Sequence, residues 1–267
     1  KARGPEYSYS SKEILTEAQK MEEEGFKEIV LTGIIIGKWF EDGKDLADLI
    51  TLLINNTKEV RYRISSLEPE NFSEKFFKLF ESGRLCSHIH MSLQSGSDAV
   101  LKRMRRTYLS DLYLEAVKKF RQGVKDIAFT TDVIVGFPGE TDEEFEETCN
   151  FVEKVGFLKV HVFPYSRREG TAAYYMEDQI DESVKRARVK KLLKISAESG
   201  MGFKKSLEGK TFKVLAESYL EEGGKVRGYT ENYVQVEFDG DETMLNQFFD
   251  VKLLRLEDSG VFTGLLV

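Results

Sequence analysis

Three segments at predicted strand ends carry residue types that could bind a small polar ligand. Residues 127–141 read IAFTTDVIVGFPGET, an apolar, β-branched run that stops at Gly136 and Gly139 before an acidic helix start. The segments HIHMSLQSGS (88–97) and HVFPYSRREGT (161–171) have the same shape. Ligands of parallel α/β sheets bind at the carboxyl ends of the strands. The three segments therefore predict one ligand site where these ends meet.

Each of these turns also has a purely structural interpretation. Gly136 and Gly139 would let the backbone approach a nucleoside, with Ile134 against the purine face, but a glycine turn that only starts a helix has the same sequence. Gln94 and Ser95 could bond a ribose or an amino-acid headgroup, but the serines of this turn could equally cap the following helix. The local pattern leaves both interpretations open.

Histidines and cysteines are too scattered to predict a metal site. His88, His90 and His161 alternate with apolar residues and lack paired ligand spacing, which favours hydrogen-bonded histidines over ligands. The only cysteines, Cys86 and Cys149, form no CxxC or CxxxCxxC motif, and Cys149 falls inside a predicted helix. An iron–sulfur cluster needs several thiolates placed together, so these two cysteines do not predict one.

Composition favours a cytosolic protein with a sizeable core. The 267 residues can form one large domain, or a large and a small one, and 41% of them are hydrophobic. No apolar run approaches the ~20 residues of a membrane span. The first residues, KARGPEYSYSS, contain no apolar leader. We therefore expect neither a membrane partner nor secretion.

The net charge of −7 hides a segregation of charge along the chain. Residues 183–205 carry eight basic groups and one acidic group, whereas 206–267 carry six basic and twelve acidic groups. The basic segment and KRMRR at 102–106 could contact RNA phosphates, although most charge runs are solvated faces. Arg167 and Arg168 follow a strand end, where a substrate would lie.

The order of predicted elements is that of a parallel α/β sheet or barrel. Strands are expected at 27–33, 60–66, 88–93, 127–135 and 157–164, and helices at 11–24, 43–56, 71–82, 97–104, 110–122 and 141–155. A long helix follows over 181–205, with Asp181 as N-cap and Ser199-Gly200 beginning to break it. From Gly209, short β-rich segments separated by glycine turns predict a small all-β barrel.

The quoted stretches resemble the radical S-adenosylmethionine (SAM) methylthiotransferase family over essentially the whole chain. The resemblance is greatest to the bacterial MtaB-type subgroup, which acts on threonylcarbamoyladenosine in tRNA. The stretches that carry it are ARGP (2–5), EIVLTG (28–33), RISSLEP (63–69), LQSGSDAVLKRM (93–104), TTDVIVGFPGETDEEF (130–145), HVFPYSRREGTAA (161–173) and GYTENYVQV (228–236). Subgroups that act on a ribosomal protein or on isopentenyladenosine differ at SLQS, SSLEP or YTENYV.

The resemblance implies an α/β fold in which a partial (β/α) radical SAM barrel, residues 1–180, precedes a small all-β TRAM barrel, residues 206–267. A basic helix, 181–205, would connect them. It also implies SAM and two 4Fe–4S clusters as cofactors. The family's CxxxCxxC motif normally lies just before the ARGP stretch, so we expect the first barrel strand and the cluster ligands to be absent from this chain, and the chain alone to be inactive.

The resemblance assigns roles to particular residues. It implies SAM-binding positions at Gln94, Ser95, Asp132, Ile134, Gly136, Phe163 and Tyr165, and a surface for tRNA at Arg167 and Arg168. The implied partners are a tRNA anticodon stem-loop, SAM and an electron donor protein. The chain departs from the family at Tyr7, Tyr9, Ile35 and Ser92.

Two alternatives remain open at this stage. One is a cluster-free RNA-binding protein built on a relic barrel. The other is a methylthiotransferase that acts on another tRNA base or on a ribosomal protein. The acidic balance of 206–267 disfavours strong electrostatic RNA binding by that segment alone.

Overall fold

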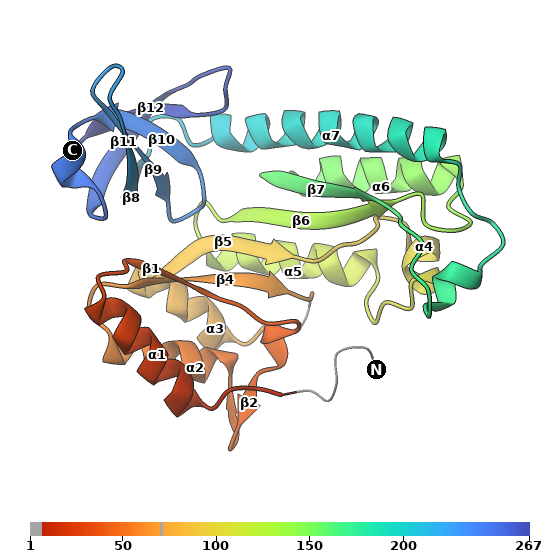
Figure 1. The fold of residues 1–267 in the computed structure, drawn as a ribbon, viewed down its shortest axis with the longest axis horizontal. Helices are drawn as coiled ribbons and strands as arrows, with labels where there is room; N and C mark the ends of the chain where they lie inside the picture. The colour runs from red at the N-terminus through yellow and green to blue at the C-terminus, as the bar shows by residue number, and fades with distance from the viewer. Residues whose placement is uncertain (1–6, 70–71) are drawn as a thin grey trace.

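The computed structural model describes residues 7–69 and 72–267, and Figure 1 shows their arrangement. An α/β part and a small β-barrel are joined by one long helix, α7 (Glu182–Lys205). The ARGP stretch at 2–5, one of those that resemble the family, lies outside the described residues. Within the described parts of the chain, no helix is long and apolar enough to cross a membrane.

The α/β part is built on a five-stranded parallel sheet, as predicted. Its spatial order is β1-β4-β5-β6-β7. The strands are β1 (Glu28–Leu31), β4 (Arg61–Leu67), β5 (Leu85–Met91), β6 (Ala128–Val135) and β7 (Lys159–Pro164). β5 begins before the predicted residue 88, because Leu85 already pairs with Tyr62 across an irregular register.

Helices cover one face of this sheet. They are α1 (Ser11–Glu23), α2 (Leu46–Asn56), α3 (Glu74–Lys78), α4 (Asp98–Arg103), α5 (Ser110–Gly123) and α6 (Asp142–Val155). The 3-10 helix η2 (Leu79–Ser82) continues α3, and the hairpin β2 (Phe40–Glu41)–β3 (Lys44–Asp45) precedes α2. Alternate strand residues such as Ile64, Ile89 and Val133 pack beneath the helices in one core.

The opposite face of the sheet is polar. The residues that alternate with the core positions form what we call the polar face: Glu28, Arg61, Arg63, His88, His90, Thr130, Asp132 and His161. Charged and hydrogen-bonding side chains are rarely buried unless they are paired, so this face is built to hold polar contacts rather than another apolar layer.

The long helix α7 does not break at Ser199-Gly200, so that prediction is wrong. The helix runs on to Lys205. A Cβ at position 200 would lie 2.4 Å from the carbonyl oxygen of Leu158, so the glycine lets α7 approach the backbone just before β7. Ser196 Oγ accepts the amide of Val160 at 2.8 Å, which satisfies a donor of this edge strand. Close packing therefore explains a glycine that otherwise weakens a helix.

The predicted small barrel is present and closed, in the order β10-β12-β11-β8-β9. Its strands are β8 (Thr211–Leu220), β9 (Lys225–Thr230), β10 (Gln235–Asp239), β11 (Phe248–Leu256) and β12 (Phe262–Leu266). Its apolar core also takes in Ala128 and Leu158, which belong to the α/β part. The two parts therefore share buried apolar surface.

A buried ion network joins the small barrel to the polar face at the end where the strands begin. Glu28 accepts hydrogen bonds from Arg61 Nε at 2.6 Å and Arg63 Nε at 2.8 Å. Arg61 donates onward to the carbonyl oxygens of Lys213 and Tyr229 at 3.2 and 3.0 Å, across 152 and 168 residues of sequence. These guanidinium groups satisfy a carboxylate on one part and backbone acceptors on the other.

The loop between β9 and β10 completes this junction. The guanidinium carbon of Arg63 lies 4.6 Å from the centroid of the Tyr233 ring. The centroid of the same ring lies 4.9 Å from that of the His88 ring. Asn232 Nδ2 donates to the carbonyl oxygen of Asp126 at 3.0 Å. The YTENYV stretch, one of the segments that resemble the family, thus packs the small barrel against the polar face near the strand starts.

Candidate functional site

An open hollow of about 730 Å³ lies at the carboxyl ends of four strands. Its lining comes from segments following β1, β4 and β5 and from β6: Thr32, Gly33, Ile34, Ser65, Ser66, Leu67, Glu68, Ser92, Gln94, Arg106 and Asp132. Most of these side chains are polar. The hollow therefore lies at the predicted edge of the sheet, where segments 88–97 and 127–141 contribute lining residues and segment 161–171 does not, and it can offer hydrogen bonds to a polar ligand.

Gln94 enters this hollow from a strained backbone. Its φ is +68°, which is uncommon for a residue with a side chain. Its amide donates to Asp132 O at 2.8 Å and its carbonyl accepts from Ile134 N at 2.9 Å, so the segment forms an isolated bridge to β6. No described residue bonds its side-chain amide. Strain held in place by neighbouring strands is typical of a functional position.

The glycine turn after β6 is fixed by a buried carboxylate. Gly136 has a φ of +70°, and its amide donates to Glu140 Oε2 at 2.6 Å. Arg188 of α7 donates to the same oxygen at 2.7 Å and to the Glu140 carbonyl at 3.0 Å. The stem of Lys185 packs against Gly136, where a Cβ would lie 2.5 Å from Cγ. The long helix therefore holds the turn in place.

Ser95 is brought to the strand end but does not face the hollow. It is fully buried, and its Oγ lies 3.1 Å from Thr148 Oγ1 and accepts the Ser97 amide at 3.2 Å. A Cβ on Gly96 would lie 2.8 Å from Thr148 Cα, so this turn packs directly on α6. Ser97 occupies the N-cap position of α4 without a side-chain capping bond. These contacts favour the structural interpretation of this serine-rich turn.

Three further predicted residues form an apolar rim beside the glycine turn, and none of them is among the residues that line the hollow. Ile134 is half-buried and pairs in register with Phe163, whose side chain is 50% exposed. Tyr165 donates its amide to Val135 O at 2.9 Å, and its ring lies 5.3 Å from that of Phe137. Its buried hydroxyl has no partner among the described residues. This rim can pack against a flat apolar ring.

Arg167 and Arg168 lie on the exposed loop after β7, outside the hollow lining. The Arg167 guanidinium donates to Tyr174 O at 2.7 Å and lies 4.7 Å from the ring centroid of Tyr174. Arg168 contributes its carbonyl oxygen to Thr171, at 2.7 Å from the threonine hydroxyl. Both side chains are accessible to a large partner.

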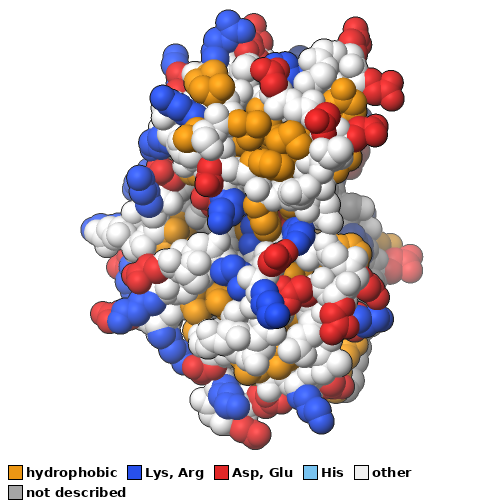
Figure 2. Space-filling model, turned by 90° about the vertical axis from the view of Figure 1, so that its left-hand side faces the viewer, with side chains coloured by type: hydrophobic (Ala, Val, Ile, Leu, Met, Phe, Trp, Pro, Cys, Tyr) orange, Lys and Arg blue, Asp and Glu red, His pale blue; other side chains and the backbone are white. Residues whose placement is uncertain are grey.

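Half of the cations in the two basic clusters are paired with acidic groups of the chain. Arg103 of KRMRR pairs with Glu144 at 2.9 Å. In α7, Lys185 and Arg188 are buried, and Lys191 and Lys194 pair with Glu146 and Glu198. Figure 2 shows acidic and basic side chains interspersed over the face that carries the barrel and the strand starts, so that face has no extended patch of one sign.

Histidines of the polar face cluster around Asp132, which lines the hollow. His90 Nδ1 and His88 Nε2 each lie 3.0 Å from Thr130 Oγ1, and His90 Nε2 lies 3.4 Å from Asp132 Oδ2. The hydrogen bond from His90 lowers the pKa of Asp132. Burial lowers the pKa of His161, which pairs in register with Asp132. Burial also lowers the pKa of His88, to about 3. Imidazoles beside a carboxylate can exchange hydrogen bonds with a ligand.

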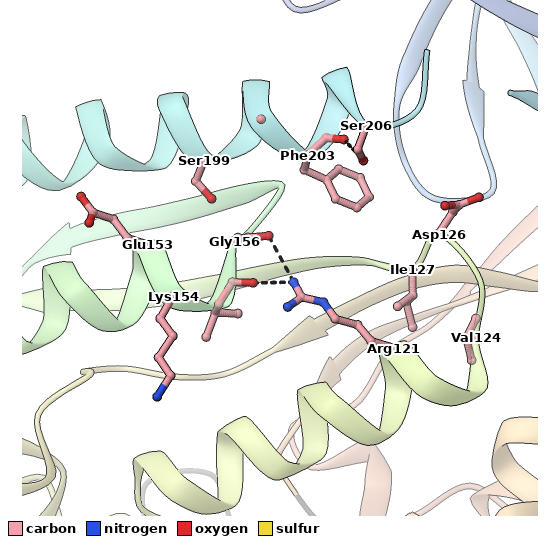
Figure 3. A pocket seen from close by; sticks show the side chains of 12 residues that line it. Arg121, Val124, Asp126, Ile127, Glu153, Lys154, Gly156, Ser199, Phe203 and Ser206 are labelled. Carbon is pink, nitrogen blue, oxygen red and sulfur yellow. Dashed lines mark hydrogen bonds between the residues drawn. The ribbon is translucent and has the colours of Figure 1, made fainter. Parts of the chain in front are cut away.

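A second hollow, of about 550 Å³, lies near the starts of β6 and β7 (Figure 3). Arg121 projects into it and donates to the carbonyl oxygens of Val155 and Gly156, which end α6. Phe203 and Ser206 contribute from α7. Because its arginine is committed to a helix terminus, this hollow serves helix packing and is separate from the strand-end site.

The described residues do not fit an iron–sulfur cluster. They contain no group of three or more His, Cys, Asp or Glu side chains placed to hold a metal ion. Cys86 and Cys149 are both buried and unpaired, and burial raises the pKa of the Cys86 thiol to about 12. A cluster needs thiolates, so residues 7–69 and 72–267 supply no step of cluster chemistry.

Comparison with known proteins confirms the resemblance seen in the strand ends. A model of the radical SAM superfamily matches residues 1–152. The chain is 41% identical over 261 residues to threonylcarbamoyladenosine tRNA methylthiotransferase MtaB of Bacillus subtilis, a match that covers 95% of this chain and 58% of that protein. It is 35% identical to the tRNA-2-methylthio-N(6)-dimethylallyladenosine synthase of a Thermoanaerobacter species, covering 94% of this chain and 54% of that protein.

The crystal structure of methylornithine synthase (PylB) shares the fold, with a TM-score of 0.50 and 15% sequence identity, over 73% of this chain and 56% of that one. The chain thus spans less than two thirds of the length of the curated relatives it matches.

Sequence reasoning missed two parts of the site. The first is the Glu140–Arg188 pair that holds the glycine turn. Glu140 lies only four positions after Gly136, but Arg188 is distant in sequence and looks like one charge among many on a basic helix. The meeting of His90 and His161 around Asp132 required the strand register.

Proposed function

This chain belongs to the radical SAM superfamily, and we propose that it forms the SAM-binding sheet and the RNA-facing β-barrel of a tRNA methylthiotransferase. The proposed reaction places a methylthio group at C2 of threonylcarbamoyladenosine beside the anticodon. The observation that carries the proposal is the 41% identity, over 95% of this chain, to a protein with that activity in its name. Superfamily members use SAM with a 4Fe–4S cluster. SAM that receives one electron from such a cluster would supply the oxidising power to remove hydrogen from an unreactive C–H bond.

The residues at the strand ends fit a nucleoside sulfonium ligand. The unbonded amide of Gln94 suits the ribose or the amino-acid end of SAM, and it is held in place by its backbone bridge to β6. Ile134 and Phe163 present an apolar rim for the purine, next to the Gly136 turn and the backbone of Tyr165. The contribution of these residues is to position the ligand and to exclude water from it.

The thiolate ligands that the chemistry requires are not among the described residues. The function proposed for this chain itself is therefore to bind SAM and RNA. The electron donor and the cluster ligands are needed only for the reaction of the whole protein. The exposed Arg167 and Arg168 and the outer surface of the small barrel are the surfaces we propose for the anticodon stem-loop.

Calorimetric titration of this chain with SAM tests the first half of the proposal. We expect binding that Gln94→Ala weakens by about tenfold, the loss of one or two hydrogen bonds. Ser95→Ala is the matched control, because Ser95 is buried away from the hollow and its loss should leave the SAM affinity unchanged. No binding of SAM by a folded chain would contradict the proposal.

Filter binding of an anticodon stem-loop at several salt concentrations tests the second half. The rival function, a cluster-free RNA-binding protein, predicts tight and steeply salt-dependent binding without SAM. We expect a shallow salt slope, because half of the cations of α7 and of KRMRR are paired with acidic groups. A preference for stem-loops carrying dimethylallyladenosine would favour the specificity of the second relative instead.

A further inference from the structure

Two side chains on β7 extend the polar face beyond Asp132, which lines the hollow, and lack a hydrogen-bond partner among the described residues. Lys159 and His161 are two residues apart, so they lie on the same face of the strand. They pair in register with Thr130 and Asp132 of the polar face. Lys159 is exposed and His161 is half-buried. Among the described residues, neither side chain has a hydrogen bond or an ion pair, whereas the charge of Lys159 is near enough to lower the pKa of His161.

Most other polar groups of this face are already engaged, although the buried Nδ1 of His88 has no partner among the described residues. Arg61 and Arg63 are bound to Glu28, and His88 and His90 share the Thr130 hydroxyl. Asp132 uses one oxygen toward His90, and its side chain remains 34% exposed. Besides His88 Nδ1, the groups of this face with capacity for new hydrogen bonds are a cation, an imidazole and one carboxylate oxygen on two neighbouring strands.

We propose that Lys159 and His161 bind the carboxylate of the threonyl group of the substrate nucleoside, and that Asp132 accepts its hydroxyl. The proposal rests on the proposed function and adds the residues that select this substrate. A threonylcarbamoyl substituent carries one carboxylate and one hydroxyl, which match one cation and one acceptor. A dimethylallyl substituent has neither group, so it would make none of these contacts and would bind less tightly.

The position of this cluster suits a substrate that lies beside SAM. Ile134 and Phe163 follow Asp132 and His161 by two residues on the same strands, so they lie about 7 Å nearer the carboxyl edge. The residues that we propose for SAM thus form one layer, and the substituent of the substrate base occupies the next layer down. Asp132, predicted from the resemblance as a cofactor-binding residue, then belongs to the substrate layer.

The test measures RNA affinity rather than turnover, with SAM present. Three anticodon stem-loops differ at one base: threonylcarbamoyladenosine, its methyl ester, and unmodified adenosine. The variants are Lys159→Gln, His161→Gln and Lys159→Arg. The control is Lys194→Gln, which removes an exposed lysine on α7. Thermal unfolding of each variant verifies that it folds.

We expect the parent chain to prefer the acid over both other RNAs. Lys159→Gln and His161→Gln should each weaken binding of the acid by about tenfold and leave the ester and adenosine RNAs unchanged, because each variant loses only its contact with the carboxylate. Lys159→Arg should restore most of the preference. If both Gln variants keep the parent's preference, this inference is wrong while the proposed function stands. If the parent shows no preference for the acid, the proposed substrate fails, and the inference fails with it.

Discussion

Glu28 should control a large part of the acid stability of this protein. Its carboxylate is bonded by Arg61 and Arg63, and these contacts outweigh burial and lower its pKa from 4.5 to about 2. The folded carboxyl therefore stays ionised at a pH where the unfolded chain takes up a proton. Stability from this group is complete above pH 4.5 and is lost as the pH falls toward 2.

The magnitude follows from the same values. Each pKa unit corresponds to 1.36 kcal/mol, so the difference between 4.5 and about 2 corresponds to ~3 kcal/mol of unfolding free energy. Glu28→Gln also leaves two buried guanidinium groups without their carboxylate, a change that typically costs about 3–5 kcal/mol. Both considerations place the loss near 3 kcal/mol at neutral pH.

The assay is urea unfolding, followed by circular dichroism, of the parent, Glu28→Gln and Glu198→Gln between pH 2.5 and 7. Glu198 is an exposed partner of Lys194 at 3.8 Å, so its loss should change stability by less than ~0.5 kcal/mol. We expect Glu28→Gln to be ~3 kcal/mol less stable at pH 7 and to show a shallower fall in stability below pH 4.5. An unfolding free energy for Glu28→Gln that declines with pH as steeply as the parent's would refute the reasoning.

Three other predictions follow from buried contacts. Gly200→Ala should lower stability by ~1–3 kcal/mol, because its Cβ would lie 2.4 Å from the Leu158 carbonyl oxygen. Gly202→Ala on the same helix is the control: its Cβ would contact nothing, so this variant should gain up to ~1 kcal/mol of stability. Equal effects of the two variants in thermal unfolding would contradict this packing. Arg188→Met should lower the unfolding free energy by about 3–5 kcal/mol, because it leaves Glu140 buried without its cation. It should also weaken SAM binding in calorimetry. Unchanged SAM affinity would show that the glycine turn does not depend on this pair. Cys86 and Cys149 should resist a thiol reagent at pH 8 until urea is added, because burial raises their pKa values to about 12 and 11; rapid labelling of the native protein would disprove this.

The sequence alone predicted the elements and the location of the site. Strand–helix alternation predicted the five parallel strands, and glycine-punctuated β-rich segments predicted the small barrel. These patterns are local, because side-chain periodicity and turn residues depend on neighbours only a few positions away. The convergence of the Gln94 and Gly136 segments also followed, since the carboxyl ends of parallel strands meet at one edge.

The partners of the charged residues could be decided only by the tertiary structure. Arg188 and Lys185 look like solvated charges of a basic helix, yet one grips the glycine turn through Glu140 and the other packs on Gly136. Gly200 looks like a helix breaker until Leu158 is placed beside it. The environment of His161 depends on the register of β7 against β6. Such pairings join residues tens to hundreds of positions apart, and a local pattern carries no information about which distant group satisfies a buried charge.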